Sequence, residues 1–134
     1  MNIRVRSIYI SAIAFLFIFI QACQGPTTDA AVSTMEKYWE YYKDEKYDSL
    51  RTFYSLRAYP YEKLNPVIYA MRDLHEKYGF VQTIHLSVKE ISDNGNSIRL
   101  LYEVKFATKS IANVFSFKKN GNGEYKIKEH LMGQ

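Results

Sequence analysis

Few side chains in this sequence could do chemistry, because its 134 residues include only one cysteine and three histidines. His75, His85 and His130 lack the spacing of metal ligands, and no carboxylate lies three or four residues beyond any of them, so we predict no metal site. The chain also has no glycine-rich phosphate loop and no serine nucleophile elbow. The sequence therefore predicts no catalytic residue and no cofactor.

The positions of the histidines favour structural roles. His85 alternates with polar residues along a predicted strand, which indicates a solvated side chain. His130 is predicted on the outward side of the last strand, and Glu103 on the outward side of an earlier one. His75 lies beside the apolar stripe of a predicted helix, where it packs its ring or, alternatively, lines a cavity.

The N-terminal segment has the composition of an export signal. Arg4 and Arg6 precede an apolar run from Ile8 to Ile20, and no acidic residue occurs before Asp29. At thirteen residues, the run is shorter than the roughly 20 residues that a membrane-spanning helix needs. The segment therefore predicts a removable signal rather than a permanent anchor.

The single cysteine follows that run directly. Ile20-Gln21-Ala22-Cys23 resembles the lipobox of bacterial lipoproteins, in which the cysteine receives diacylglycerol and becomes the new N-terminus. Gln21 departs from the small or hydroxylated residue that is usual two positions before the cysteine, which is the most permissive position of the motif. The alternative is a signal peptidase cut after Ala30, with Thr28 three residues before the cut. We expect lipidation at Cys23, which would place the protein in the cell membrane or outer membrane with its domain outside the cytoplasm.

The mature chain is expected to form one domain. Residues 1–22 are predicted as the signal peptide, residues 23–30 as a flexible tether and residues 31–134 as a single α+β domain. Without the first 22 residues, 112 residues remain with 16 basic and 14 acidic side chains, so the formal charge is only +2. This balance, without any block rich in lysine and arginine, excludes a nucleic-acid partner.

Helices are predicted in the first half of that domain. Apolar residues recur three and four positions apart over residues 29–42, which predicts an amphipathic helix capped by Thr28 or Asp29. A second, short helix is predicted with Asp48 as its cap and an end near Ser55.

A third helix has the clearest boundaries. Asn65 is predicted as its cap, Pro66 as its first-turn proline and Gly79 as the residue that ends it.

After Gly79 the pattern changes from helical to alternating, which predicts strands. Turns rich in Asn and Gly at residues 93–96 and 120–123 separate some of these strands, and Asn113 interrupts one apolar series. The residues predicted to face the core are Ile84, Leu86 and Val88; Ile98, Leu100, Tyr102, Val104 and Phe106; Ile111, Phe115 and Phe117; and Tyr125, Ile127 and Leu131.

Strands joined by tight turns form an antiparallel sheet, and one apolar face of it is the available partner for the helical stripes. The predicted fold class is therefore α+β, with N-terminal helices packed on a curved antiparallel sheet of about four strands.

This order resembles the cone-shaped nuclear transport factor 2-like superfamily, also called cystatin-like, and particularly its small bacterial lipoproteins of unknown function. The resemblance rests on Trp39-Glu40-Tyr41-Tyr42 before Tyr47-Asp48, on Tyr78-Gly79, on the Asn-Gly hairpin and on Gly123 to Ile127, and it covers residues 29–132. It implies a cavity between sheet and helices, which some members use for isomerisation or dehydration. None of these motifs is catalytic, and a fold does not fix a function.

Aromatic residues are the compositional oddity, with twelve tyrosines. We predict that Tyr38 and Tyr41 lie at the rim of the core, with a partner surface as the alternative. The residues predicted to line a cavity or its rim are Trp39, Tyr42, His75 and Tyr102.

Two functions from different classes follow. The first is a non-catalytic, lipid-anchored envelope lipoprotein that binds a protein partner or a small apolar ligand, and a homodimer through the sheet face is compatible with it. The alternative is a small cavity enzyme of the isomerase or dehydratase type, which first requires a buried His75 or an inward Glu103.

Overall fold

The computed structural model describes residues 28–133. The predicted signal peptide, Cys23 and most of the predicted tether lie outside this range, so those predictions concern a part of the chain that is not described. Within it, no helix is both long enough and apolar enough to cross a membrane.

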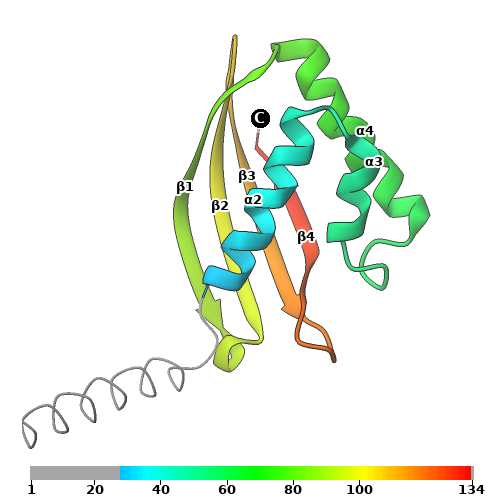
Figure 1. Cartoon of the computed structure of the whole chain (residues 1–134), viewed down its shortest axis with the longest axis vertical. Helices are drawn as coiled ribbons and strands as arrows, with labels where there is room; N and C mark the ends of the chain where they lie inside the picture. The colour runs from blue at the N-terminus through cyan, green and yellow to red at the C-terminus, as the bar shows by residue number, and fades with distance from the viewer. Residues whose placement is uncertain (1–27, 134) are drawn as a thin grey trace, which may run out of the picture.

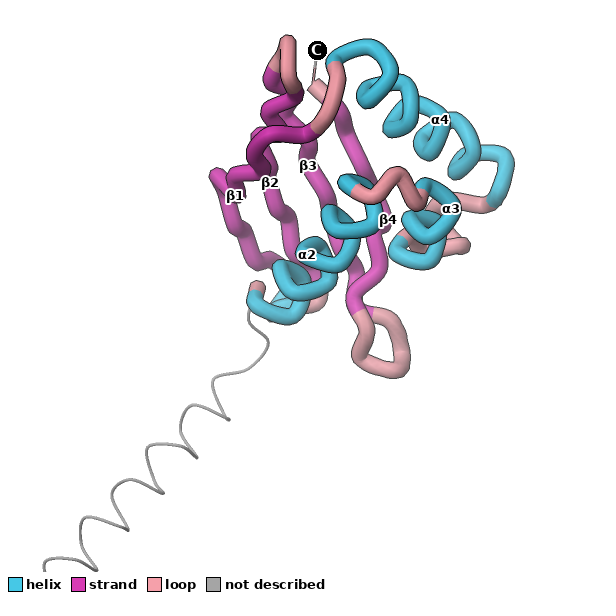
Figure 2. The backbone as a smooth tube through the Cα atoms, turned by 45° about the horizontal axis from the view of Figure 1, so that its top comes forward, coloured by secondary structure: helices cyan, strands magenta, loops and turns pink. Residues whose placement is uncertain are grey.

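In the part of the chain that the structure describes, three helices precede a four-stranded antiparallel sheet in which each strand pairs with its neighbours in the sequence (Figure 1). The elements are α2 (Asp29–Lys43), α3 (Tyr47–Leu50), the 3-10 turn η1 (Arg51–Phe53), α4 (Tyr61–Tyr78), β1 (Val81–Ser92), the 3-10 turn η2 (Asp93–Gly95), β2 (Ser97–Phe106), β3 (Ser110–Lys119) and β4 (Tyr125–Met132). The helices cover one face of the curved sheet and leave the other face open (Figure 2). The predicted α+β class is confirmed.

The first helix agrees closely with its prediction. Its buried residues Ala31, Met35, Trp39 and Tyr42 recur at helical spacing and face the sheet. Tyr38, which we predicted at the rim, is fully buried, because it lies one position from Trp39 and so falls within the broad apolar stripe of α2.

The two other helices start earlier than predicted. Asp48 lies in the first turn of α3 rather than at its cap. α4 begins at Tyr61 after the extended Pro60, so Pro66 lies inside the helix instead of in its first turn. An internal proline removes one backbone hydrogen bond, but the longer helix brings Leu64 into the core, where it is fully buried.

The sheet core follows the predicted alternation most closely in β2, where all five predicted residues are buried. The turn before it has left-handed backbone at Asn94, with φ of 56°, and at Gly95, with φ of 88°, which the Asn-Gly pair tolerates. Asn113 does not leave the inward face of β3: it is fully buried between Ile111 and Phe115.

Two β-bulges reverse the predicted alternation. Beyond the extra residue of a bulge, side chains predicted to face the core face outward, and those predicted to face outward face the core. In β1, a register shift between Leu86 and Val88 turns Val88 outward, where it is 40% exposed. In β4, Ile127 pairs with Phe117 and Glu129 with Ser116. Lys128 therefore has no paired residue in β3 and is the inserted residue of the bulge. Leu131 is consequently 55% exposed, and the prediction that it faces the core is wrong.

The described residues contain a complete core. Every buried apolar side chain in this part of the chain lies between Ala31 and Ile127, and together they form one cluster. A domain with its own core can fold independently. The chain from Gln24 onward therefore contains what the fold needs.

Gly79, at the end of α4, is the most constrained glycine in the fold. Its φ is +86°, and a Cβ atom built on it would lie 2.9 Å from Cβ of Ala107. We expect Gly79→Ala to reduce the free energy of unfolding by about 2 kcal/mol, as measured by urea denaturation. The matched control is Gly121→Ala, because a Cβ atom there meets nothing within 4 Å. Equal stabilities of the two variants would contradict this account.

Candidate ligand-binding site

A pocket of about 680 Å³ opens at one end of the domain. Residues 51–57 form one wall, the start of α4 continues it, and the β3–β4 hairpin forms the opposite wall. The segment after η1 is fixed to the sheet, because the Ser55 backbone N–H donates to the Ile127 carbonyl over 2.8 Å and Tyr54 forms a parallel bridge with Ile127. The pocket therefore lies between two attached elements.

Apolar side chains form part of the pocket wall. Tyr54 and Leu64 are buried behind it, whereas Leu56 is 64% exposed and Tyr61 is 68% exposed. Large apolar side chains that remain open to solvent beside a hollow are a common feature of binding sites. This rim offers contact area to an apolar group.

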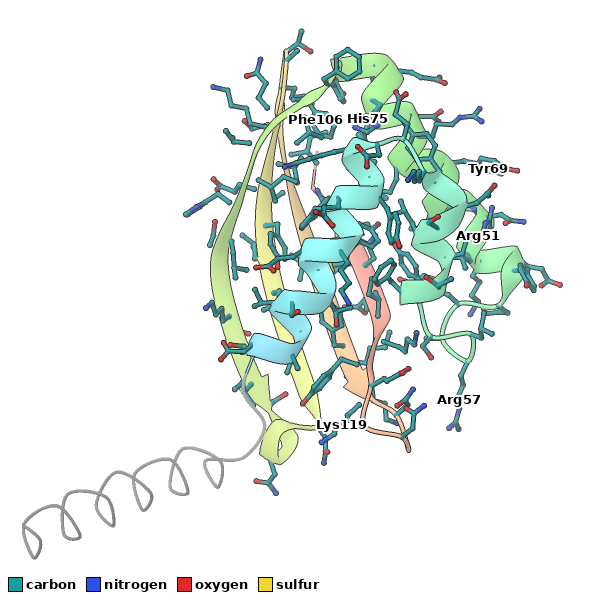
Figure 3. The ribbon with its side chains drawn as sticks, in the orientation of Figure 1. Arg51, Arg57, Tyr69, His75, Phe106 and Lys119 are labelled. Atoms are coloured by element: carbon teal, nitrogen blue, oxygen red, sulfur yellow. The ribbon has the colours of Figure 1, made fainter. Side chains whose placement is uncertain are left out.

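Five basic side chains line the same pocket: Arg51, Arg57, Lys118, Lys119 and Lys126. No carboxylate is among the lining residues that the structure describes. Figure 3 shows Arg57 on the loop beyond η1 and Lys119 at the end of β3, both at the end of the domain where the β3–β4 turn lies. The lining is thus strongly positive, although the mature chain has a formal charge of only +2.

Two of these cations have partners within the domain. Arg51 donates to Oδ1 of Asn65 over 2.5 Å and lies 3.4 Å from Oδ1 of Asp48. Lys126 donates to the Thr52 carbonyl over 2.7 Å and lies 3.9 Å from a Glu124 carboxylate oxygen.

The other three cations, Arg57, Lys118 and Lys119, have no side-chain hydrogen bond or ion pair with any described residue.

Directly behind the pocket, Tyr54 belongs to a buried hydrogen-bond network. Its hydroxyl lies 2.7 Å from the Tyr38 hydroxyl and 2.9 Å from Nδ1 of His130. Nε2 of His130 lies 2.8 Å from Oδ1 of Asn113, and the His130 backbone N–H donates to the Tyr59 hydroxyl over 2.7 Å. We predicted His130 on the outward side of β4, and this is wrong because the bulge at Lys128 turns it inward.

The direction of each bond in this network follows from its acceptors. Oδ1 of Asn113 can only accept, so Nε2 of His130 donates and carries the proton. Burial lowers the pKa of His130 to about 3, so the ring is neutral at pH 7 and Nδ1 accepts from the Tyr54 hydroxyl. Tyr54 oxygen then accepts from Tyr38. Every member is satisfied, which makes the network a structural connection rather than a poised acid or base.

His75 is the centre of a second buried cluster. Its ring stacks on Tyr42 at a centroid distance of 4.1 Å, and its Nδ1 lies 2.6 Å from the Tyr47 hydroxyl. Burial lowers the pKa of His75, and its Nε2 is buried without a hydrogen-bond partner among the described residues. The neutral ring thus packs as an aromatic side chain between α2 and α3.

The four residues predicted for a cavity or its rim lie in the core. Trp39 packs edge-on against Tyr102 at 5.5 Å and against Tyr42 at 5.8 Å, and Tyr42 in turn stacks on His75. None of the four lines the pocket of about 680 Å³. His85 and Glu103 are exposed, as predicted.

Sequence reasoning missed the basic residues of the pocket. They come from two segments some 60 positions apart, and each segment carries only two or three of them. The pair Lys118-Lys119 before the turn at residues 120–123 was the available signal, but only the pairing of β4 with Tyr54 brings Arg57 to the same hollow.

Comparisons with known proteins show the fold and nothing more specific. No family model matches the chain, and no curated protein matches it. Among solved structures, the chain is similar to Bd1075 of Bdellovibrio bacteriovorus, with a TM-score of 0.56 and 16% sequence identity. The match covers 77% of this chain and 38% of that chain, so this protein spans well under half of the length of Bd1075.

The buried His130 predicts a pH-dependent stability. A histidine in the unfolded chain titrates near the ordinary pKa of 6.5, whereas burial lowers the pKa of the folded ring to about 3. As the pH falls through this window, the unfolded chain takes up a proton that the native ring does not, so stability decreases. We expect a loss of about 2 kcal/mol between about pH 7.5 and about pH 5 from His130 alone, measured by denaturant unfolding. His75 adds to the loss with the same sign.

The variant His130→Gln should reduce this pH dependence, whatever its stability at neutral pH. The control His85→Gln alters an exposed ring and should retain the wild-type dependence. An unchanged dependence in His130→Gln would show that His130 is not the group responsible.

Proposed function

We propose that the protein is a lipid-anchored lipoprotein of the bacterial envelope whose domain, outside the cytoplasm, binds a small ligand with an apolar part and does not transform it. The observation that carries the proposal is the pocket of about 680 Å³, in which exposed Leu56 and Tyr61 lie beside cations without partners. The lipid anchor is argued from Ile20 to Cys23 and the short apolar run before it.

The arrangement of the titratable groups supports binding rather than catalysis. A cavity enzyme of the isomerase or dehydratase type needs an acid or base aimed at its substrate. Glu103 is exposed on the opposite face of the sheet from the helices. His75 meets the requirement of burial, but its ring stacks on Tyr42 and its Nδ1 is hydrogen-bonded to the Tyr47 hydroxyl. His75 also does not line the pocket.

The open face of the sheet supports a second part of the proposal, pairing with another copy of the chain. The outward side chains of Val88, Leu101, Val114 and Leu131 lie opposite one another across all four strands. This aliphatic row crosses a face that no described helix covers. A second, identical face would cover it in a two-fold arrangement.

Charges on β2 favour the same pairing. Arg99 and Glu103 flank Leu101 on the outward face, one on each side of the row, and neither has an ion pair within the described residues. A two-fold axis along the row would bring Glu103 of one protomer opposite Arg99 of its partner, twice in the interface. The face is therefore self-complementary in charge.

The oligomeric state tests this pairing. We expect the chain from Gln24, with Cys23 absent, to sediment as a dimer, and Leu101→Lys to shift it to the monomer because a charge replaces the centre of the row. Tyr69→Lys alters an exposed apolar residue on α4 and should remain dimeric. A wild type that stays monomeric as its concentration rises would exclude this interface.

The anchor is tested by intact mass and detergent partitioning of the full chain made in a bacterial host. We expect a mature species that begins at Cys23, carries the added mass of diacylglycerol and partitions into detergent, because the thioether-linked lipid supplies the apolar surface. Cys23→Ala should lose the mass and the partitioning. A product cut after Ala30, without lipid, would contradict the anchor and leave the pocket unaffected.

A further inference from the structure

We propose that the pocket binds the phosphate group of an anionic lipid in the membrane that holds Cys23. This inference rests on the proposed lipid anchor and names the ligand class of the same pocket. It is argued from the charge of the lining, from the apolar rim and from the end of the domain at which the pocket opens.

The charge of the lining requires an anionic ligand. Arg57 lines the pocket from one wall and Lys118 and Lys119 from the other, and no carboxylate is among the described lining residues. Asn120 also lines the pocket, and because only its Oδ1 is used, as acceptor of the Glu124 backbone N–H, its amide group remains a possible donor. Several cations with an amide donor match the multiple acceptor oxygens of a phosphate group better than the two of a single carboxylate.

The rim indicates that the phosphate belongs to a lipid. Leu56 and Tyr61 stand at the same opening as the cations, and each is about two-thirds exposed. A basic surface interleaved with exposed aliphatic and aromatic side chains has the composition that binds at the interface of an anionic bilayer. A free phosphate ion has no apolar group that could pack against these side chains.

The pocket also opens at the end of the domain where α2 begins. A smaller hollow is lined by Ala30 and Thr34 of α2 together with Gly123 and Glu124 of the β3–β4 turn, so the start of α2 lies beside this turn. Figure 1 shows both at the same end of the domain. Lys118 and Lys119 belong to the same hairpin.

The length of chain before α2 limits how far this end can be from the membrane. Asp29 lies six positions after Cys23, and six positions of fully extended chain span at most about 20 Å. A domain held by Cys23 can therefore bring its basic end within reach of the lipid phosphates.

The test uses the chain from Gln24 without a lipid, so that binding cannot come from the anchor. Its binding is measured by co-sedimentation with vesicles that contain phosphatidylglycerol in phosphatidylcholine, and with vesicles of phosphatidylcholine alone. We expect binding to the anionic vesicles only. The double variant Lys118→Gln/Lys119→Gln should bind about 30-fold more weakly, because each basic residue near the surface contributes a several-fold gain in affinity.

The matched control is Lys89→Gln/Lys105→Gln, which removes the same charge from exposed positions outside the pocket. It should bind like the wild type. An equal loss in both double variants would mean that net charge alone attracts the vesicles, and would overturn the pocket as the site. If the chain is folded, as its circular dichroism spectrum shows, but binds neither kind of vesicle, the pocket as a lipid-binding site is also overturned.

Inorganic phosphate distinguishes the two sources of the ligand group. If the lipid is the ligand, phosphate competes weakly, and Leu56→Ser/Tyr61→Ser reduces binding to vesicles but leaves weak phosphate binding unchanged. Tight phosphate binding that the apolar variant does not alter would overturn the lipid as the source. Because this chain carries no anchor, these outcomes are independent of the mass and partitioning of the Cys23 species.

Discussion

The hydroxyl of Tyr54 lies between Tyr38 of α2 and His130 of β4, and the arrangement of the domain depends on this contact. His130 can take part only because the bulge at Lys128 turns it inward. Since His130 is neutral, each bond in the chain has one donor and one acceptor, and Asn113 ends it. A helix, the segment after η1 and two strands are thus joined by directional bonds within an otherwise apolar core, where such bonds fix one arrangement.

The hydrogen bonds of Tyr54 also determine where the pocket forms. Tyr54 is one of the lining residues, and its hydroxyl is held by hydrogen bonds to Tyr38 and His130. Residues 55–57, which carry the exposed Leu56 and the cation of Arg57, follow directly on an anchored residue. The opposite wall is a hairpin whose turn is closed by its own hydrogen bonds, such as that from the Glu124 backbone N–H to Asn120. Two walls supported in this way keep like charges near one another without internal partners.

The fold could be predicted from the sequence wherever burial follows a simple period, as in α2 and β2. It could not be predicted where one extra residue changes the face of a strand, because alternation before and after a bulge looks alike in sequence. For this reason Leu131 was predicted to face the core and His130 to face outward, whereas the structure has them the other way round. The pocket was missed because its cations are close only in space, whereas the start of α4 was missed because Pro66 resembles a first-turn proline yet lies inside the helix.

Among the described residues, β1 pairs on one side only, with β2, so its other edge is free of any described strand. Its pairing with β2 is interrupted twice, between Val81 and Thr83 and between Leu86 and Val88. A strand from another chain adds to a sheet by matching an uninterrupted row of backbone donors and acceptors, and irregular, charged edges oppose this. With Lys89 and Glu90 exposed beyond the second interruption, β1 is a poor template for strand addition. Even at high local concentration, copies of the domain are thereby protected from joining through β1 into a continuous intermolecular sheet.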